Sequence, residues 1–64
     1  MDKQMAFTYT NHRGETAERH VVPQSVYFGK TEFHPEKQWM LRGFDTDRQA
    51  FRDFAMADIT KVER

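Results

Sequence analysis

The sequence predicts an all-β domain: a small five-stranded antiparallel barrel of the Sm-like or Src-homology-3-like kind. Five short segments alternate polar and apolar residues as half-buried strands do, and turn-forming residues separate them. No stretch keeps the period of about 3.6 residues that an amphipathic helix needs. A turn-like interruption before the last segment favours this arrangement over an oligonucleotide-binding barrel, which needs more chain and a helix.

Length and composition limit what such a domain can do alone. The chain has 64 residues, no cysteine, 38% hydrophobic residues and 14% aromatic residues. We expect residues 1–4 to be disordered and residues 5–64 to form a single domain. Without disulfides or thiolate zinc ligands, a domain of this size is marginally stable. A compact barrel, a partner chain or self-association must therefore stabilise it.

The overall charge is neutral. Ten basic and ten acidic side chains cancel, so no global field draws the protein to nucleic acid or to a membrane surface. An anion-binding surface must therefore be a local patch. No apolar run is long enough to span a bilayer, and the N-terminal residues lack a signal-peptide core. We expect a soluble cytoplasmic protein with no membrane association.

The first half of the chain is expected to hold two strands. Met5 to Thr10 alternates and predicts the first strand. Asn11 to Gly14 has the composition of a turn. An extended course then runs from Glu15 to Phe28, with a bend at Pro23-Gln24 because proline lacks the backbone donor of a strand ladder.

The segment after Gly29 is predicted to be irregular. Lys30 to Lys37 is polar, and Pro35 disfavours a helical conformation at His34. Phe33 is the large apolar residue of this segment, and its ring is expected to pack back over the core.

The segment Gln38 to Asp45 is the anchor of the predicted fold. It holds the only Trp and the only Leu, Trp39 and Leu41, followed at the same spacing by Gly43. Alternation places these three residues on one face of a strand. We expect Trp39 and Leu41 in the core, and the glycine at a bend or a close backbone approach.

The last third of the chain is expected to contain a hairpin partner and a closing strand. A polar connection ending at Gln49 leads into a predicted strand from Ala50 to Met56. Ala57-Asp58 has the character of a single helical turn. The segment from Ile59 to Val62 predicts a short strand that completes the sheet.

Arg52 is the most informative polar residue. It alternates in register with Phe54, and Arg19 alternates in register with Val21, so both guanidinium groups lie among apolar neighbours. A buried charge without a partner costs several kcal/mol. One interpretation is that Arg52 and Arg19 form structural ion pairs with acidic residues. The candidates are Asp45, Asp53, Asp58 and Glu18.

The other interpretation is an anion pocket. Arg19 and Arg52, with Arg42, could surround a phosphate group, which arginine forks bind well. Trp39 is a further candidate ligand-binding residue, because an indole ring can stack on a nucleobase. Its register with Leu41 favours the core instead.

Nothing in the sequence indicates catalysis or metal binding. The three histidines, His12, His20 and His34, are scattered and have no metal-ligand spacing with one another or with a carboxylate. No nucleophile lies in a histidine–acid pattern, and no glycine-rich phosphate loop is present. We predict a protein that is not an enzyme, with no catalytic residue, metal or cofactor.

The order of these signals resembles the WYL domain, a bacterial Sm-like β-barrel module named for a Trp-Tyr-Leu triplet. The resemblance spans roughly residues 7–62, and two positions depart from it. Met40 stands where the family has its Tyr, and Asp58 stands where it usually has an Arg. The residues that carry the resemblance are Phe7, Tyr9, Gly14, Arg19, Pro23, Trp39, Leu41, Arg52, Phe54 and Ile59.

The resemblance implies a regulatory function. WYL domains usually follow the helix-turn-helix of transcriptional regulators, or accompany a helicase or CRISPR effector, and sense nucleotides or single-stranded nucleic acid. We predict a non-enzymatic module that binds a nucleotide, single-stranded nucleic acid or other anionic ligand. The predicted ligand-binding residues are Arg19, Arg42, Arg52 and Trp39. The alternative is a structural or interaction module whose strand edges pair with a partner chain or a second copy.

Overall fold

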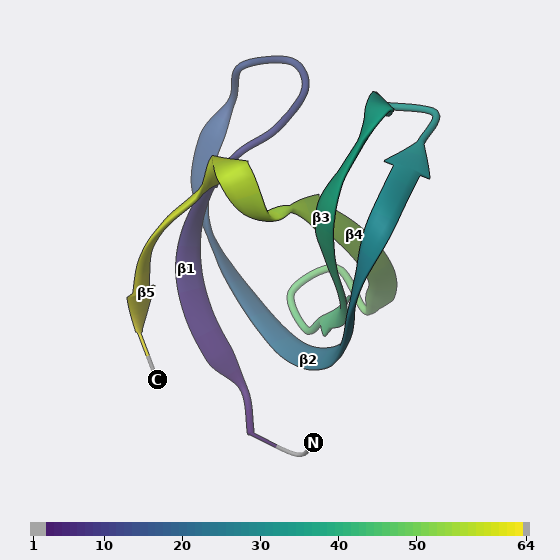
Figure 1. The fold of residues 1–64 in the computed structure, drawn as a ribbon. Coiled ribbons are helices and arrows are strands. Elements are labelled where there is room, and N and C mark those ends of the chain that lie inside the picture. Colours follow the sequence, from purple (N-terminus) through teal and green to yellow (C-terminus); the bar gives the residue numbers. More distant parts are fainter. Residues whose placement is uncertain (1–2, 64) are drawn as a thin grey trace.

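The computed structural model describes residues 3–63, which form one antiparallel sheet of five strands (Figure 1). Of the four residues predicted to be disordered, Met1 and Asp2 lie outside the described residues. The elements are β1 (Met5–Thr10), β2 (Thr16–Thr31), β3 (His34–Asp45), β4 (Ala50–Ala55), the 3-10 helix η1 (Met56–Asp58) and β5 (Ile59–Glu63). The single helical turn predicted at Ala57-Asp58 is therefore confirmed.

The sheet is open. Its strand order is β4-β3-β2-β1-β5, so within residues 3–63 the strands β4 and β5 are the two edges. The end of β4 contacts the interior strand β1 through a side chain: the Ala55 backbone N–H donates to the Tyr9 hydroxyl at 3.0 Å. The all-β, five-stranded antiparallel prediction is confirmed, whereas closure into an Sm-like or Src-homology-3-like barrel is not.

The β2–β3 hairpin is longer than predicted. β2 runs through Pro23, where the pairing register with β3 shifts before Ser25, so the expected bend is a bulge. Both strands then continue to Thr31 and His34, which pair with each other. The prediction of an irregular segment from Lys30 to Lys37 is wrong. Pro35 disfavours a helix but is compatible with a strand that has a free edge. This part of β3 has a free edge, because β4 pairs with β3 only from Met40 onward.

The core is a cluster of five buried side chains from four strands. Phe54 contacts two aromatic rings edge to face, with centroids 5.2 Å from Phe7 and 5.0 Å from Tyr9. Such geometry suits the charge distribution of aromatic rings. The cluster consists of Phe7, Tyr9, Val21, Leu41 and Phe54.

The predicted core positions have different outcomes. Leu41 is buried as expected, but Trp39 is 57% exposed, so its core assignment is wrong. Trp39 lies beyond the last residue of β3 that pairs with β4, where no strand flanks it on that side. Phe33 is also exposed rather than packed on the core.

Gly43 marks the close backbone approach that the sequence predicts. A Cβ at this position would lie 2.9 Å from the Val22 carbonyl oxygen and would overlap the Val21 side chain. Only glycine lets β3 pass β2 this closely. Among residues 3–63, no helix is long and apolar enough to cross a membrane.

Candidate functional site

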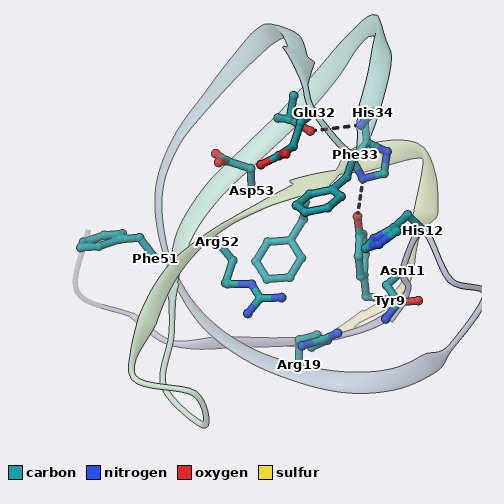
Figure 2. A pocket seen from close by; sticks show the side chains of 12 residues that line it. Tyr9, Asn11, His12, Arg19, Glu32, Phe33, His34, Phe51, Arg52 and Asp53 are labelled. Carbon is teal, nitrogen blue, oxygen red and sulfur yellow. Dashed lines mark hydrogen bonds between the residues drawn. The ribbon is translucent and has the colours of Figure 1, made fainter.

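A cleft of about 560 Å³ opens between the β1–β2 turn, the tip of the β2–β3 hairpin and β4 (Figure 2). Its two arginines come from separate strands, Arg19 from β2 and Arg52 from β4. Figure 2 shows the two guanidinium groups extending toward each other. The lining residues are Tyr9, Asn11, His12, Arg19, Thr31, Glu32, Phe33, His34, Phe51, Arg52, Asp53 and Phe54.

Arg19 is buried but incompletely paired. Strand alternation places it opposite Phe7 on the core face, and it is only 7% exposed. Its Nη1 atom lies 3.5 Å from Asp45 Oδ2, a long contact for a charge-assisted hydrogen bond. Its Nε atom has no partner among the described residues. An unsatisfied buried donor costs about 1–3 kcal/mol, so Arg19 retains hydrogen-bonding capacity.

The two carboxylate oxygens of Asp45 have different partners: Oδ2 contacts Arg19 in the core, and Oδ1 contacts a turn. Its Oδ1 atom accepts the backbone N–H groups of Asp47 and Arg48 at 3.1 and 3.2 Å. These bonds stabilise the β3–β4 turn. They also orient the carboxylate so that it does not form a bidentate pair with the Arg19 guanidinium. The geometry explains why the Arg19–Asp45 contact is long.

Arg52 has no carboxylate partner among residues 3–63. It forms none of the ion pairs predicted for it, because Asp45 contacts Arg19 and Asp53 pairs with Arg42 at 3.3 Å. The side chain is exposed at the cleft. The predicted structural ion pair is therefore confirmed for Arg19, which contacts Asp45, and is wrong for Arg52.

Tyr9 brings a hydroxyl group to the inner end of the cleft. The hydroxyl accepts the Ala55 N–H and lies 3.4 Å from His34 Nε2. Burial raises the pKa of Tyr9 above its ordinary value, opposed first by the hydrogen bond from Ala55 and then by the charges of Arg19 and Arg52. Both guanidinium groups thus act electrostatically on the same point in the cleft.

An aromatic pair lies at the rim. The rings of His12, from the β1–β2 turn, and Phe33, from the hairpin tip, stack with centroids 4.5 Å apart and planes 19° apart. Phe33 is 56% exposed, so much of its surface is open to solvent. Neither His12 nor Phe33 is among the site residues predicted from the sequence. The signal that could have indicated a site role is an aromatic residue within a polar, turn-forming segment.

The other two predicted site residues lie outside the lining of the cleft. Arg42 pairs with Asp53, and its Cζ atom lies 5.1 Å from the centroid of the Phe51 ring. Because Asp53 and Phe51 line the cleft, Arg42 contacts two lining residues without lining the cleft itself. Trp39 lies on a different surface, against Phe28. The structure thus brings together Arg19 and Arg52, but not Trp39.

Comparison with known proteins gives a family match. A model of the WYL domain family matches residues 1–64, the whole chain. No curated protein and no solved structure matches. Met40, which stands where the family's Tyr is expected, is fully buried and does not line the cleft, whereas Tyr9 on β1 does.

Proposed function

The chain belongs to the WYL domain family of regulatory ligand-binding domains, and on this premise we propose that it binds a nucleotide, free or within a single strand, in the cleft between Arg19 and Arg52. The module is non-enzymatic in this proposal. It acts in the cytoplasm, where ligand occupancy is read out by a regulatory system such as transcription.

The observation that carries the proposal is the pair of incompletely matched arginines. Arg19 has a buried Nε without an acceptor, and Arg52 has no carboxylate partner among the described residues. Guanidinium groups bind phosphate oxygens through paired, charge-assisted hydrogen bonds. The neighbouring carboxylate of Asp53 is already paired with Arg42, which weakens its repulsion of an anion.

The aromatic rim supports a ligand that carries a ring. A base stacked on an aromatic side chain gains about 1–3 kcal/mol. With the phosphate between Arg19 and Arg52, the open face of Phe33 is available to a nucleobase, and the stacked His12 holds that ring in place. This orientation assigns charge recognition to the inner cleft and ring recognition to its rim.

The test is calorimetric titration of adenosine monophosphate and a short oligothymidylate into the wild-type chain and an Arg52→Gln variant. We expect the variant to bind roughly 10- to 100-fold more weakly, because a hydrogen bond to a charged group contributes about 1.5–3 kcal/mol. Affinity should also fall as sodium chloride is added. Phe33→Ala should weaken binding of the nucleotide but not of inorganic phosphate.

Arg48→Gln is the matched control. Arg48 is an exposed arginine in the β3–β4 turn, and it does not line the cleft. Its replacement removes the same charge and should leave affinity within about twofold. The proposal would be contradicted if neither ligand bound to the wild-type chain. It would also be contradicted if the Arg52 and Arg48 variants lost affinity equally.

A further inference from the structure

A second surface feature lies on the outer half of the β2–β3 hairpin. Val26, Phe28, Trp39 and Met56, here called the hairpin patch, line a shallow groove of about 620 Å³. They are 53, 57, 57 and 42% exposed, in that order. The groove shares no lining residue with the cleft. Phe28 and Trp39 lie opposite each other with ring centroids 5.4 Å apart, so the patch is a packed surface.

The hairpin patch continues the core face of the sheet. Val26 lies directly opposite Leu41, a member of the buried cluster. Phe28 and Trp39 follow two residues further along each strand, and alternation keeps them on the same face. The apolar surface therefore runs from the core to the outer hairpin without a break, but the outer part has no cover within residues 3–63.

The size of the patch fits a small, reversible interface. Aromatic side chains bury roughly 150–250 Å² each, so the exposed parts of the four residues sum to roughly 350 Å². A standard interface buries roughly 800 Å² per partner, of which the apolar centre is only a part. Each patch therefore supplies roughly 350 Å² of apolar centre per partner, and with a polar rim this makes an interface below the standard size.

The charges around the patch favour a second copy of the chain over a nucleic acid or a membrane. Residues 26–39 carry two lysines and two glutamates, Lys30, Lys37, Glu32 and Glu36, so this part of the hairpin is neutral. A lipid or nucleic-acid surface would need a basic rim. A second copy of the chain carries the same neutral rim, so its approach meets no net charge repulsion.

The edge strand β5 is a poorer site for pairing. Lys61 has a φ of 51°, the left-handed region, and the register between β1 and β5 shifts around it. Such a bulge distorts the row of donors and acceptors that an added strand would need. Self-association through this edge is therefore disfavoured relative to the hairpin patch.

We propose that the hairpin patch is a self-association surface through which two copies of the chain form a reversible dimer. Each copy contributes the same four residues, as a twofold interface requires. The contact buries Trp39, the only tryptophan of the chain, and covers the part of the core face that a single copy leaves exposed.

The test is sedimentation velocity over a concentration series, with Trp39 fluorescence recorded on the same samples. We expect the sedimentation coefficient to rise with concentration and the emission to shift to shorter wavelength. Val26→Lys should lower the association constant at least about tenfold, because it places an unpaired charge in the interface. Val62→Lys is the matched control, because Val62 is 52% exposed on β5, outside the patch. The association constant of this variant should stay within about twofold of the wild-type value.

Further controls distinguish a loss of association from a loss of folding. Far-UV circular dichroism confirms that each variant folds, and Phe28→Ser provides a second disruption that adds no charge. Arg52→Gln should leave association unchanged, so failure of the cleft proposal and of this one are distinguishable. A monomer at every concentration, equal losses from Val26→Lys and Val62→Lys, or a chain that stays monomeric but binds vesicles of phosphatidylcholine and phosphatidylglycerol would overturn the proposal.

Discussion

The inner and outer halves of the β2–β3 hairpin are built from similar residues but lie in opposite environments. Val21 and Leu41 in the inner half are buried, whereas Phe28 and Trp39 in the outer half are exposed. The inner half is flanked by β1 and β4, and the outer half pairs only within the hairpin. Alternation therefore decides which face a side chain occupies, and the flanking strands decide whether that face is buried.

The same contrast separates the two candidate surfaces. The cleft lies where three elements converge on buried Arg19, so it can offer a charged group in a partly desolvated position. The hairpin patch lies on the outer hairpin beside Met56 of η1, so it offers apolar area with a neutral rim. The first arrangement suits a small anion, and the second suits another polypeptide.

The largest expected effect comes from truncating one phenylalanine in each region. Phe54→Ala removes the ring that contacts Phe7 and Tyr9 in the core and should cost about 3–5 kcal/mol of unfolding free energy. Phe28→Ala, on the exposed hairpin face, should cost less than about 1 kcal/mol. Urea unfolding followed by circular dichroism measures both.

A domain of this size has only about 3–5 kcal/mol of stability, so Phe54→Ala should be largely unfolded even without urea. The measurement belongs at low protein concentration, where association through the hairpin patch does not add to the stability of the wild type. Similar losses for the two variants would show that the outer hairpin is as well packed as the core, and would contradict the difference between the two halves.

A smaller effect is expected from adding one methyl group to a glycine in each half. Gly43→Ala forces a Cβ to 2.9 Å from the Val22 carbonyl oxygen and into the Val21 side chain, and should cost about 1–3 kcal/mol. At Gly29 the nearest atoms are Cδ2 and Cε2 of Tyr27, both at 3.3 Å, and this side chain can move. Gly29→Ala should therefore change stability by less than about 1 kcal/mol.

Thermal unfolding of the two alanine variants under the same conditions compares their melting temperatures. The prediction requires that Gly43→Ala lower the melting temperature clearly more than Gly29→Ala. The reverse order would mean that β2 and β3 can separate at the inner half, and would contradict the close approach.

The strand positions were predictable because they depend on local patterns. The alternation from Met5 to Thr10 predicts a strand, and Gly43 predicts a bend or a close backbone approach; the structure shows the strand and the close approach. The extent of the β2–β3 hairpin was not predictable, because the polar residues around Pro35 suit an uncovered two-stranded ribbon as well as a loop. Trp39 was misassigned because its burial depends on how far β4 extends, which Trp39 and its neighbours do not encode.

The candidate site was predictable only in part, for a similar reason. Register placed Arg19 on the same face as Val21 without deciding which face is inward, and the structure buries both side chains. Whether Arg52 pairs with a carboxylate depends on which acids the other arginines occupy, a matter of tertiary geometry. The stacking of His12 on Phe33 joins two turns that are distant in sequence, so no local pattern could predict it.

The smallest expected effect concerns a histidine at the inner end of the hairpin. His20 on β2 contacts Asp47 in the β3–β4 turn, with Nδ1 2.7 Å from Oδ2, and the Thr46 N–H donates to the His20 carbonyl oxygen at 2.9 Å. The hydrogen bond to Asp47, with smaller contributions from the charges of Glu18 and Asp45, raises the pKa of His20 above its ordinary value of 6.5. In the outer half of the hairpin, the contact with a neighbouring turn is the stacking of Phe33 on His12, which involves no ion pair.

The raised pKa fixes the direction of the pH dependence. The folded chain binds the His20 proton more tightly than the unfolded chain, so this stabilisation is fully present below pH 6.5 and is lost as the pH rises through the raised folded value. The unfolding free energy should therefore fall slightly between about pH 6 and pH 8. His20→Gln and Asp47→Asn should each flatten that slope, which urea titrations at several pH values would measure. An unchanged slope in both variants would show that the contact does not hold the inner end of the hairpin to the turn.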